Sequence, residues 1–353
     1  MRPRPAVLLT SHIYAAPTNR VKLDALRAAG VELTAVTAAR WKESLFDVPP
    51  SPDGQLVTLP TLFAGRNNAF LYRAKLRCIL LQVRPDILHI EQEPISMVTG
   101  QWLWAAHGLP LKITFFTWEN IARRLSPLQL WIERWTLSQA KGCVAGNAEA
   151  ANLLRAKGFS GKVVVSPILG IDSTKCHSEP RSGEESLALP GVFTVGFVGR
   201  LVKEKGIRVL NEAVRGLDVR LLAVGRGPEH VNGEVVGGVR PEQVKDTLRQ
   251  MDVLVLPSLT TPKWKEQFGR VLIEAMAGGA PVIGSNSGAI PETIGDAGLI
   301  VPEGDVAALR AAIIRLKDDA ELRAELSRRG LERVKRWSHK TVAKELIELW
   351  QSI

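Results

Sequence analysis

The sequence has little of what marks a secreted or membrane-spanning chain. Its 353 residues include three cysteines, Cys78, Cys143 and Cys176, which are too few and too scattered for a disulfide framework or a cysteine zinc site. The most apolar stretch, residues 97–116, contains polar side chains and a Gly-Leu-Pro break at 108–110, so it predicts a helix followed by a buried strand and not a membrane span. The start of the chain does not resemble a signal peptide. We therefore expect a protein of the reducing cytoplasm.

The composition excludes several other classes. Apolar residues make up 45% of the chain and charged residues 23%, close to the average for a globular protein. Disordered, collagen-like and coiled-coil chains have different compositions and are excluded. At about 150 residues per domain, the length predicts two domains or one large barrel.

Positive charge is concentrated in the first half. The chain has 46 Lys and Arg against 36 Asp and Glu, a net charge of +10. Residues 1–180 hold 21 basic against 13 acidic residues, whereas residues 181–353 hold 25 against 23. Such an excess suits a polyanionic partner such as nucleic acid, an anionic membrane or a phosphorylated substrate, although a globular protein can also be basic without one.

Short apolar runs alternate with helical patterns along the whole chain. The expected strands cover residues 6–10, 31–37, 56–60, 86–90, 111–117, 142–146, 162–167, 193–199, 219–225, 233–238, 253–257, 280–285 and 298–302. Regular alternation of this kind predicts parallel sheets joined by right-handed helical crossovers. The fold class is therefore α/β, with two doubly wound, Rossmann-like domains.

A polar stretch without an apolar period, residues 173–190, divides the chain. We expect an N-terminal acceptor-binding domain over 1–175, a linker over 176–190 and a C-terminal donor-binding domain over 191–335. A final helix, 336–353, is expected to return to the N-terminal domain. The tail from Val306 is helical by pattern, with two arms separated by residues 329–340. Ligands of doubly wound domains bind at the carboxyl ends of the strands, which predicts a cleft between the domains.

Two cations follow the first expected strand of the second domain. Arg200 lies directly after that strand, and Lys205 lies where the next helical pattern begins. Free backbone N–H groups at a helix start, together with two flexible cations, suit a diphosphate; a basic surface loop is the simpler alternative. The nearby turn at 224–229 is glycine-rich, but it lacks the full dinucleotide fingerprint, so a nicotinamide or flavin enzyme is not indicated.

Two glutamates eight positions apart form the strongest motif. If most of the interval from Glu266 to Glu274 is helical, their carboxylates lie roughly 12 Å apart along the axis. That separation suits the two ends of an elongated, hydroxyl-rich ligand better than a paired acid and base. The amides of Gln267, Phe268 and Gly269 are then expected at a helix N-terminus, where they attract an anion.

These segments together resemble a known family. FVGRL at 197–201, a Glu-x7-Glu pair around FG, IEAMA at 273–277, PVIGS at 281–285 and SGAIPE at 287–292 are similar to retaining GT-B glycosyltransferases of family 4. The resemblance covers about residues 190–310, and elsewhere it rests on architecture alone. It implies transfer of a hexosyl group from a nucleotide diphosphate sugar to an acceptor, with retention of anomeric configuration.

The resemblance also implies roles for the second domain's residues. Arg200 and Lys205 would hold the diphosphate and stabilise its departure, and Glu274 would hold the ribose. Glu266, with the amides of Gln267, Phe268 and Gly269, would hold the sugar. Glu266, Arg200 and Lys205 are thus the catalytic candidates. No cofactor or metal is expected, because the two cations replace the metal at the diphosphate.

The first half departs from the family pattern. The loop after the first strand, residues 10–20, has no glycine, and Phe116 stands where many members have a histidine. Candidates for acceptor or cleft contacts, all at expected strand ends or loops, are Thr18, Asn19, Glu91, Glu93 and Glu119.

One basic stretch of the first half suits a membrane surface. Within residues 65–85, cations interleave with aromatic and leucine side chains and no acid intervenes; the proposed contacts are Arg66, Arg73, Lys75 and Arg77. We expect docking at the inner face of the cytoplasmic membrane and a lipid-linked or cell-surface glycan precursor as acceptor. An amphipathic helix packed on the sheet is the competing interpretation.

Two alternatives to a glycosyltransferase are open. The first is another sugar enzyme of the same fold, an epimerase or a phosphorylase, although no clear lysine site for pyridoxal phosphate is present. The second is a basic nucleic-acid-binding protein, for which the sequence carries no helix-turn-helix, zinc or RNA-binding signature. We therefore expect no nucleic-acid partner.

Overall fold

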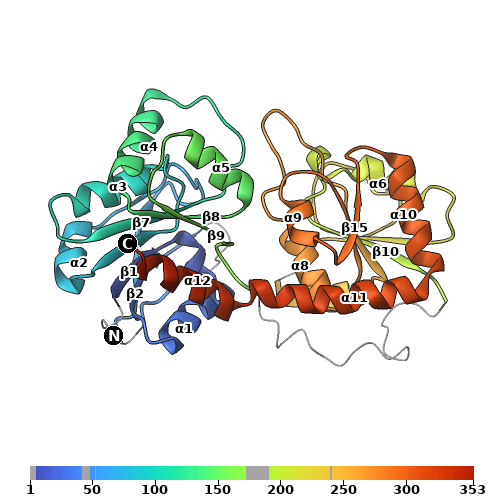
Figure 1. The fold of residues 1–353 in the computed structure, drawn as a ribbon, viewed down its shortest axis with the longest axis horizontal. Coiled ribbons are helices and arrows are strands. Elements are labelled where there is room, and N and C mark those ends of the chain that lie inside the picture. The colour runs from blue at the N-terminus through green and yellow to red at the C-terminus, as the bar shows by residue number, and fades with distance from the viewer. Residues whose placement is uncertain (1–4, 42–47, 52, 172–190, 239–240) are drawn as a thin grey trace. The chain divides into compact units, whose positions relative to one another are not determined.

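The computed structural model describes residues 5–41, 48–51, 53–171, 191–238 and 241–353 (Figure 1). Its contacts divide the chain into two compact units. The first contains Met1–Gly170 and His339–Ile353, and the second contains Ile171–Ser338. The expected linker at 176–190 lies outside the described residues.

The first unit is built on a parallel sheet of seven strands, in the order β3-β2-β1-β6-β7-β8-β9. The strands are β1 (Ala6–Thr10), β2 (Glu32–Ala38), β3 (Leu56–Leu59), β6 (Ile87–Ile90), β7 (Lys112–Thr117), β8 (Gly142–Ala145) and β9 (Lys162–Val165). Each coincides with an expected strand. β6 and β8 are buried along their whole length, and apart from His89 their residues are apolar or glycine. A short antiparallel pair, β4 (Thr61–Leu62) and β5 (Leu71–Tyr72), was not predicted.

Helices cover both faces of this sheet (Figure 1). They are η1 (His12–Ala15), η2 (Pro17–Arg20), α1 (Val21–Ala28), α2 (Leu76–Val83), α3 (Met97–Ala106), α4 (Pro127–Gln139), α5 (Ala148–Ala156) and α12 (His339–Gln351). α1 and α12 pack together on one face, and α2 and α3 pack on the other. The C-terminal α12 also contacts β8, where a Cβ on Gly142 would lie 2.8 Å from Leu349 Cδ1. The final helix is therefore part of the first unit.

The second unit contains a parallel sheet of six strands in the order β12-β11-β10-β13-β14-β15. The strands are β10 (Thr194–Val198), β11 (Arg220–Val224), β12 (Glu234–Val236), β13 (Val253–Leu256), β14 (Val282–Ser285) and β15 (Gly298–Val301). The helices are η3 (Lys203–Lys205), α6 (Ile207–Val214), α7 (Pro241–Leu248), α8 (Arg270–Ala277), α9 (Ile290–Ile294), α10 (Val306–Asp318), α11 (Ala320–Val334) and η4 (Lys335–Trp337). Both sheets are parallel and helix-covered, which confirms the predicted fold class.

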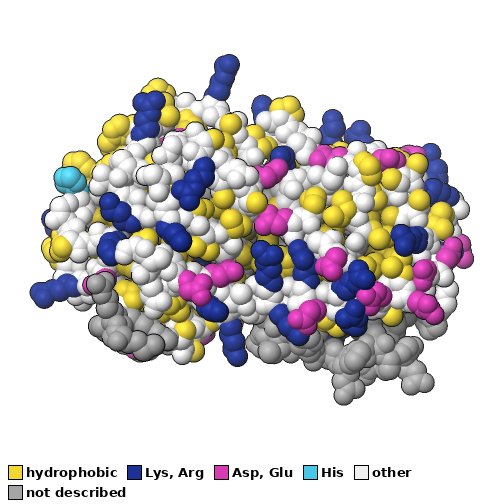
Figure 2. All heavy atoms as spheres, in the orientation of Figure 1, with side chains coloured by type: hydrophobic (Ala, Val, Ile, Leu, Met, Phe, Trp, Pro, Cys, Tyr) yellow, Lys and Arg dark blue, Asp and Glu magenta, His cyan; other side chains and the backbone are white. Residues whose placement is uncertain are grey.

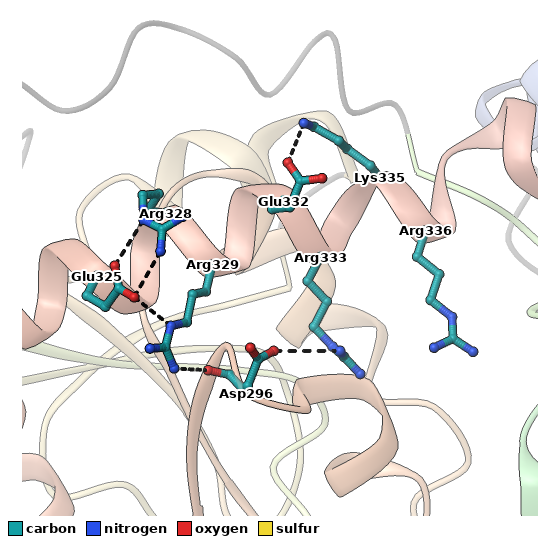
Figure 3. A pocket seen from close by; sticks show the side chains of 8 residues that line it. All are labelled: Asp296, Glu325, Arg328, Arg329, Glu332, Arg333, Lys335 and Arg336. Atoms are coloured by element: carbon teal, nitrogen blue, oxygen red, sulfur yellow. Dashed lines mark hydrogen bonds and ion pairs between the residues drawn. The ribbon is translucent and has the colours of Figure 1, made fainter.

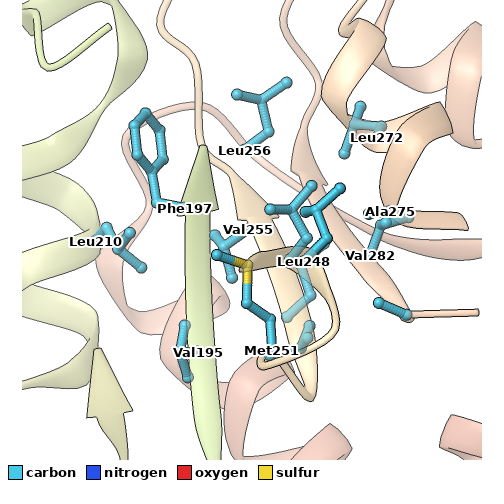
Figure 4. Packing of buried hydrophobic residues seen from close by; sticks show 14 of the residues in the cluster. Val195, Phe197, Leu210, Leu248, Met251, Val255, Leu256, Leu272, Ala275 and Val282 are labelled. Atoms are coloured by element: carbon cyan, nitrogen blue, oxygen red, sulfur yellow. The ribbon is translucent and has the colours of Figure 1, made fainter. Parts of the chain in front are cut away.

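The core of the second unit requires a close approach between strand and loop. Met251 lies against β10 among buried aliphatic side chains (Figure 4). A Cβ on Gly196 would lie 2.0 Å from the Met251 Sδ atom, so only glycine fits in the strand at that position. This packing fixes β10 beside β13, and the carboxyl ends of those two strands carry the candidate site.

The break expected at 329–340 is partly wrong, because α11 continues to Val334. Gly330 lies inside this helix, where a Cβ would lie 3.1 Å from Met276 Cγ on α8. The glycine serves close packing between helices and does not end one. In the described part of the chain, no helix is long and apolar enough to cross a membrane.

Candidate active site

The carboxyl edge of the second sheet brings together loops that are far apart in sequence. The loop after β10 carries Arg200, whose side chain is exposed. Its guanidinium makes no hydrogen bond or ion pair with any residue that the structure describes. Arg200 is thus a cation available to a ligand.

Lys205 reaches the same edge because a glycine follows it. Gly206 has a φ of 72°, and a Cβ there would lie 1.9 Å from the Pro257 carbonyl oxygen after β13. The Leu259 amide donates to the Glu204 carbonyl oxygen at 2.8 Å, which joins the two loops. The close approach places the Lys205 side chain against the segment that contains Glu266.

Glu266 is held by contacts from other segments of the second unit. Its Oε2 atom lies 2.6 Å from Lys205 Nζ and accepts a 2.9 Å hydrogen bond from Ser258 Oγ. Its backbone carbonyl accepts from the Ala289 amide at 3.1 Å, in the turn after β14. The side chains of Lys205 and Glu266 are only 14% and 10% exposed. The structure thus brings together two predicted site residues, Lys205 and Glu266.

The interval between the two glutamates is less helical than expected. Gly269, with a φ of 71°, caps α8, so the helix begins only at Arg270 and the amides of Gln267 and Phe268 precede it. The helix covers only residues 270–274 of the interval, so the 12 Å estimate, which assumed helix over most of it, loses its basis. Glu274 lies in α8, where its Oε1 accepts from Arg270 Nε at 2.8 Å and its side chain is 31% exposed.

Sequence reasoning missed two residues of this site. Ser258 binds the Glu266 carboxylate, and the Trp264 ring faces Lys205 Nζ at 5.1 Å from its centroid. Ser258 follows β13 directly, so its position at a strand end was a usable signal. Trp264 lies in a loop without periodicity, and nothing in the sequence pairs it with Lys205.

The glycine-rich turn at 224–229 serves packing. A Cβ on Gly225 would lie 1.8 Å from the Gly199 carbonyl oxygen, and one on Gly227 would lie 2.1 Å from that of Leu201. These two glycines let the loops after β10 and β11 touch, and so they fix the backbone on both sides of Arg200.

In the first unit, Glu91 is sealed in the core. Its carboxylate pairs with Lys22 and accepts a 2.7 Å hydrogen bond from the Tyr14 hydroxyl, and its side chain is 0% exposed. His89 lies 3.8 Å away, and burial lowers its pKa well below the usual range. The carboxylate of Glu91 therefore presents no surface to an acceptor.

Glu93 joins two loops at the carboxyl edge of the first sheet. Its carboxylate accepts from Thr117 Oγ1 at 2.6 Å and from the Trp118 amide at 2.8 Å. Burial raises the pKa of Glu93 to about 7, although these hydrogen bonds oppose the shift. Phe116, at the family's histidine position, is buried, and its ring packs against Trp118 with centroids 5.0 Å apart.

The other cleft candidates have structural contacts. Glu119 is buried and pairs with Lys157, which also lies 2.6 Å from Glu133. Asn19 donates to the Ile13 carbonyl oxygen at 2.8 Å within the η1–η2 turn, and Thr18 is exposed beside it.

The four cations proposed for membrane contact are all exposed, namely Arg66, Arg73, Lys75 and Arg77. The apolar side chains between them are not, because Phe70, Tyr72 and Leu76 are buried in the core. The expectation that aromatic residues of 65–85 face a bilayer is wrong for Phe70 and Tyr72, because both side chains are packed in the hydrophobic core of the first unit.

A surface pocket of about 650 Å³ lies elsewhere on the second unit (Figure 3). It is lined by Asp296, Glu325, Arg328, Arg329, Glu332, Arg333, Lys335 and Arg336. Arg333 donates to the carbonyl oxygens of Thr293 and Glu292 at the end of α9, at 2.7 and 2.5 Å. These contacts hold α11 against α9, and none of the predicted site residues lines this pocket.

Comparison with known proteins covers both units. Residues 192–319 match the family model described as glycosyl transferases group 1, and residues 23–172 match that of glycosyltransferase family 4. The chain is 29% identical to a phosphatidyl-myo-inositol mannosyltransferase of Mycobacterium leprae, over 92% of this chain and 91% of the relative. It is 30% identical to the enzyme of that name from Mycolicibacterium smegmatis, over 76% and 71%.

A solved structure shares the fold over nearly the whole chain. It is Anabaena HepE in complex with UDP and glucose, with a TM-score of 0.71, 16% identity and coverage of 99% of this chain and 100% of that one. The two parallel-sheet units and these matches define a glycosyltransferase of the GT-B type. The chain belongs to the family 4 glycosyltransferases.

Proposed function

We propose that this enzyme transfers a hexosyl group from a nucleotide diphosphate sugar to an acceptor, with retention of anomeric configuration. One observation carries the proposal: the loop after β10 presents the Arg200 guanidinium, which has no side-chain partner among the described residues, and, five residues on, the Lys205 ammonium at the Glu266 carboxylate. A bound diphosphate is stabilised by cations, and the hydroxyl groups of a sugar donate hydrogen bonds to acceptors such as a carboxylate. This loop and its neighbour supply both.

The proposed mechanism assigns the main electrostatic work to the two cations. Arg200 and Lys205 neutralise the charge that develops on the departing diphosphate, in place of a metal. Glu266 and the amides of Gln267, Phe268 and Gly269 hold the sugar, and Glu274 holds the ribose. No side chain is assigned as a nucleophile. The acceptor therefore attacks on the face that the diphosphate leaves, assisted by the leaving group itself.

A panel of UDP-, GDP- and ADP-sugars, screened by thermal shift, tests the donor. A ligand that binds the folded state at a hundred times its Kd stabilises it by about 2.7 kcal/mol. The best donor is then incubated with an acceptor extract, and NMR of the product reports the anomeric configuration. Inversion would reject the retaining mechanism, and stabilisation by none of the three would reject a nucleotide-sugar donor of these types.

We also propose that the first unit docks on an anionic membrane, on the cytoplasmic side, and receives a lipid-linked or cell-surface glycan precursor. The exposed cations Arg66, Arg73, Lys75 and Arg77 support this, and so do the relatives named for phosphatidyl-myo-inositol. Trp104 of α3 and Trp131 of α4 are 76% and 55% exposed. Figure 2 shows hydrophobic and basic side chains near one another over this part of the first unit. Exposed indoles and cations together are typical of bilayer interfaces.

Liposome co-sedimentation tests the membrane proposal. Binding should require anionic lipid, weaken as salt rises, and fall when Arg73, Lys75 and Arg77 are changed to Glu. The matched control makes the same change at three exposed cations of the second unit, Arg215, Arg328 and Lys335, and should bind normally. Equal loss in both variants would indicate an effect of net charge alone and would contradict a docking surface.

A further inference from the structure

A short turn positions an indole ring at the candidate donor site. Between β13 and α8, Thr261 and Trp264 form an antiparallel bridge, in which the Thr261 amide donates to the Trp264 carbonyl oxygen at 2.8 Å. The Thr261 hydroxyl accepts from the Trp264 amide at 2.9 Å. These bonds fix the backbone of Trp264, and with it the point from which the indole extends.

The ring and a carboxylate hold the same ammonium. Lys205 Nζ lies 5.1 Å from the Trp264 ring centroid and 2.6 Å from Glu266 Oε2. Trp264 and Glu266 are two positions apart in one segment, and the lysine side chain is 14% exposed. The carboxylate and the ring thereby hold a flexible lysine side chain in one place.

We propose that Trp264 is a positioning residue for the donor, which holds the Lys205 ammonium ready for the diphosphate. This inference rests on the proposed function. It goes beyond it because neither the Glu-x7-Glu pair nor the two cations require an aromatic ring at this position.

The chemistry favours a ring over a second carboxylate at this position. A cation over an aromatic face gains about 0.5 to 1 kcal/mol at a solvated site, and more where it is desolvated. The ring carries no net charge, so it orients the ammonium without repelling the diphosphate. A second carboxylate would hold the lysine as firmly and would add like charge beside the ligand.

Calorimetry with UDP and with GDP tests the proposal on the full-length protein. The nucleotide that binds the wild-type protein is then measured with each variant. Trp264→Leu should lower its affinity by about two- to fivefold, which is the equivalent of the cation–π energy. Trp264→Phe should bind within twofold of the wild type, because it keeps an aromatic face. The matched control is Phe193→Leu, which removes another aromatic ring facing a cation, Arg323 at 5.6 Å, next to the opposite end of β10. It should leave nucleotide affinity unchanged.

A double-mutant cycle tests whether the ring acts through the lysine. In a Lys205→Met background, Trp264→Leu should cause no further loss of affinity. An equal loss with and without Lys205 would overturn the proposal, as would wild-type affinity in Trp264→Leu or an equal loss in Trp264→Phe. If Arg200→Ala and Lys205→Met weaken binding while Trp264→Leu does not, only this inference fails. If none of the three weakens binding, the proposed donor site fails with it.

Discussion

The carboxyl edges of the two parallel sheets differ in how far their charged side chains are buried and paired. In the first unit, Lys22 and Glu91 pair in the interior, with side chains 3% and 0% exposed. In the second unit, Arg200 is exposed without an ion pair among the described residues, and Lys205 and Glu266 keep some exposure. The same type of edge therefore carries a sealed pair in one unit and available charge in the other.

The buried pair of the first unit serves the fold, whereas the more exposed charges of the second unit can bind a ligand. Moving a buried ion out of its pair leaves an uncompensated charge, which costs several kcal/mol, so a sealed pair cannot exchange partners with a ligand. The Lys22 ammonium also donates to the Ile168 carbonyl oxygen at 2.7 Å, and thereby ties α1 to the chain beyond β9. Among the described residues, Lys205 has one carboxylate partner, Glu266, and its side chain keeps 14% exposure. Its partner can change when an anion arrives.

The largest expected effect concerns the sealed pair. Lys22→Met should destabilise the protein by about 3 to 5 kcal/mol, because it leaves the Glu91 carboxylate buried without a counter-charge. Urea denaturation measures the loss. The matched control is Lys344→Met, which breaks an exposed 3.8 Å pair with Glu348 in α12 and should cost no more than about 1 kcal/mol. Similar costs for the two variants would contradict the structural role assigned to Lys22.

The second prediction concerns Arg200, the exposed cation at the edge of the second sheet. Arg200→Ala should reduce nucleotide diphosphate affinity by roughly 2 to 3 kcal/mol, since it removes a charge-assisted contact, and should leave the melting temperature nearly unchanged. The control is Arg208→Ala, another exposed arginine of the same unit, which pairs with Glu229 at 2.8 Å. A lower melting temperature with normal affinity for UDP and GDP would make Arg200 structural and would remove the contrast between the edges.

The sequence predicted the main strands of both sheets because parallel strands buried on both faces leave continuous apolar runs. It also placed Arg200 and Lys205 at a strand end and a helix start, where the structure has them. The β4–β5 pair escaped prediction because each strand has only two residues, too few for a period. The break expected at 329–340 was placed too early, because Gly330 packs against a neighbouring helix while its own helix continues to Val334.

Side-chain partners were the part that the sequence could not supply. Glu91 and Glu93 both follow β6, two positions apart, yet Glu91 is sealed by Lys22 and Tyr14 whereas Glu93 accepts from the loop after β7. In an extended chain, side chains two positions apart point to the same face, so the sequence pattern cannot predict that these two glutamates have different partners. The same holds for Trp264, which contacts Lys205 through a close approach of two loops.

A smaller effect should appear in the pH dependence of stability. The pKa of Glu93 in the folded protein, about 7, is raised by burial above its usual value of 4.5. Between these values the folded state binds more protons than the unfolded chain, so the stability that Glu93 contributes is full below about pH 4.5 and is lost as the pH rises through about 7. Glu93→Gln should remove this dependence, whose slope is about 1.4 kcal/mol per pH unit between the two pKa values, in urea titrations at acidic and at mildly alkaline pH. A parallel pH dependence in both proteins would show that Glu93 is ionised throughout.

The smallest expected effect distinguishes the two glutamates of the second edge. If Glu274 holds the ribose, Glu274→Gln should weaken a free nucleotide and its sugar nucleotide to the same degree, by about 1 kcal/mol, because the ribose is common to both. Arg270→Ala is the control, since it breaks the 2.8 Å pair with Glu274 but keeps the carboxylate, and it should bind nearly normally.

Glu266→Gln should weaken binding of the sugar nucleotide only, since the Glu266 carboxylate faces the sugar in the proposed arrangement. Binding of the free nucleotide should not weaken in Glu266→Gln. The substitution removes the negative charge that pairs with Lys205, so the lysine keeps its positive charge for the diphosphate. Calorimetry of each variant with both ligands measures the two affinities. Equal behaviour of the two glutamine variants would contradict the separate roles proposed for them, and a loss of free-nucleotide binding in Glu266→Gln alone would reverse the proposed orientation of the donor.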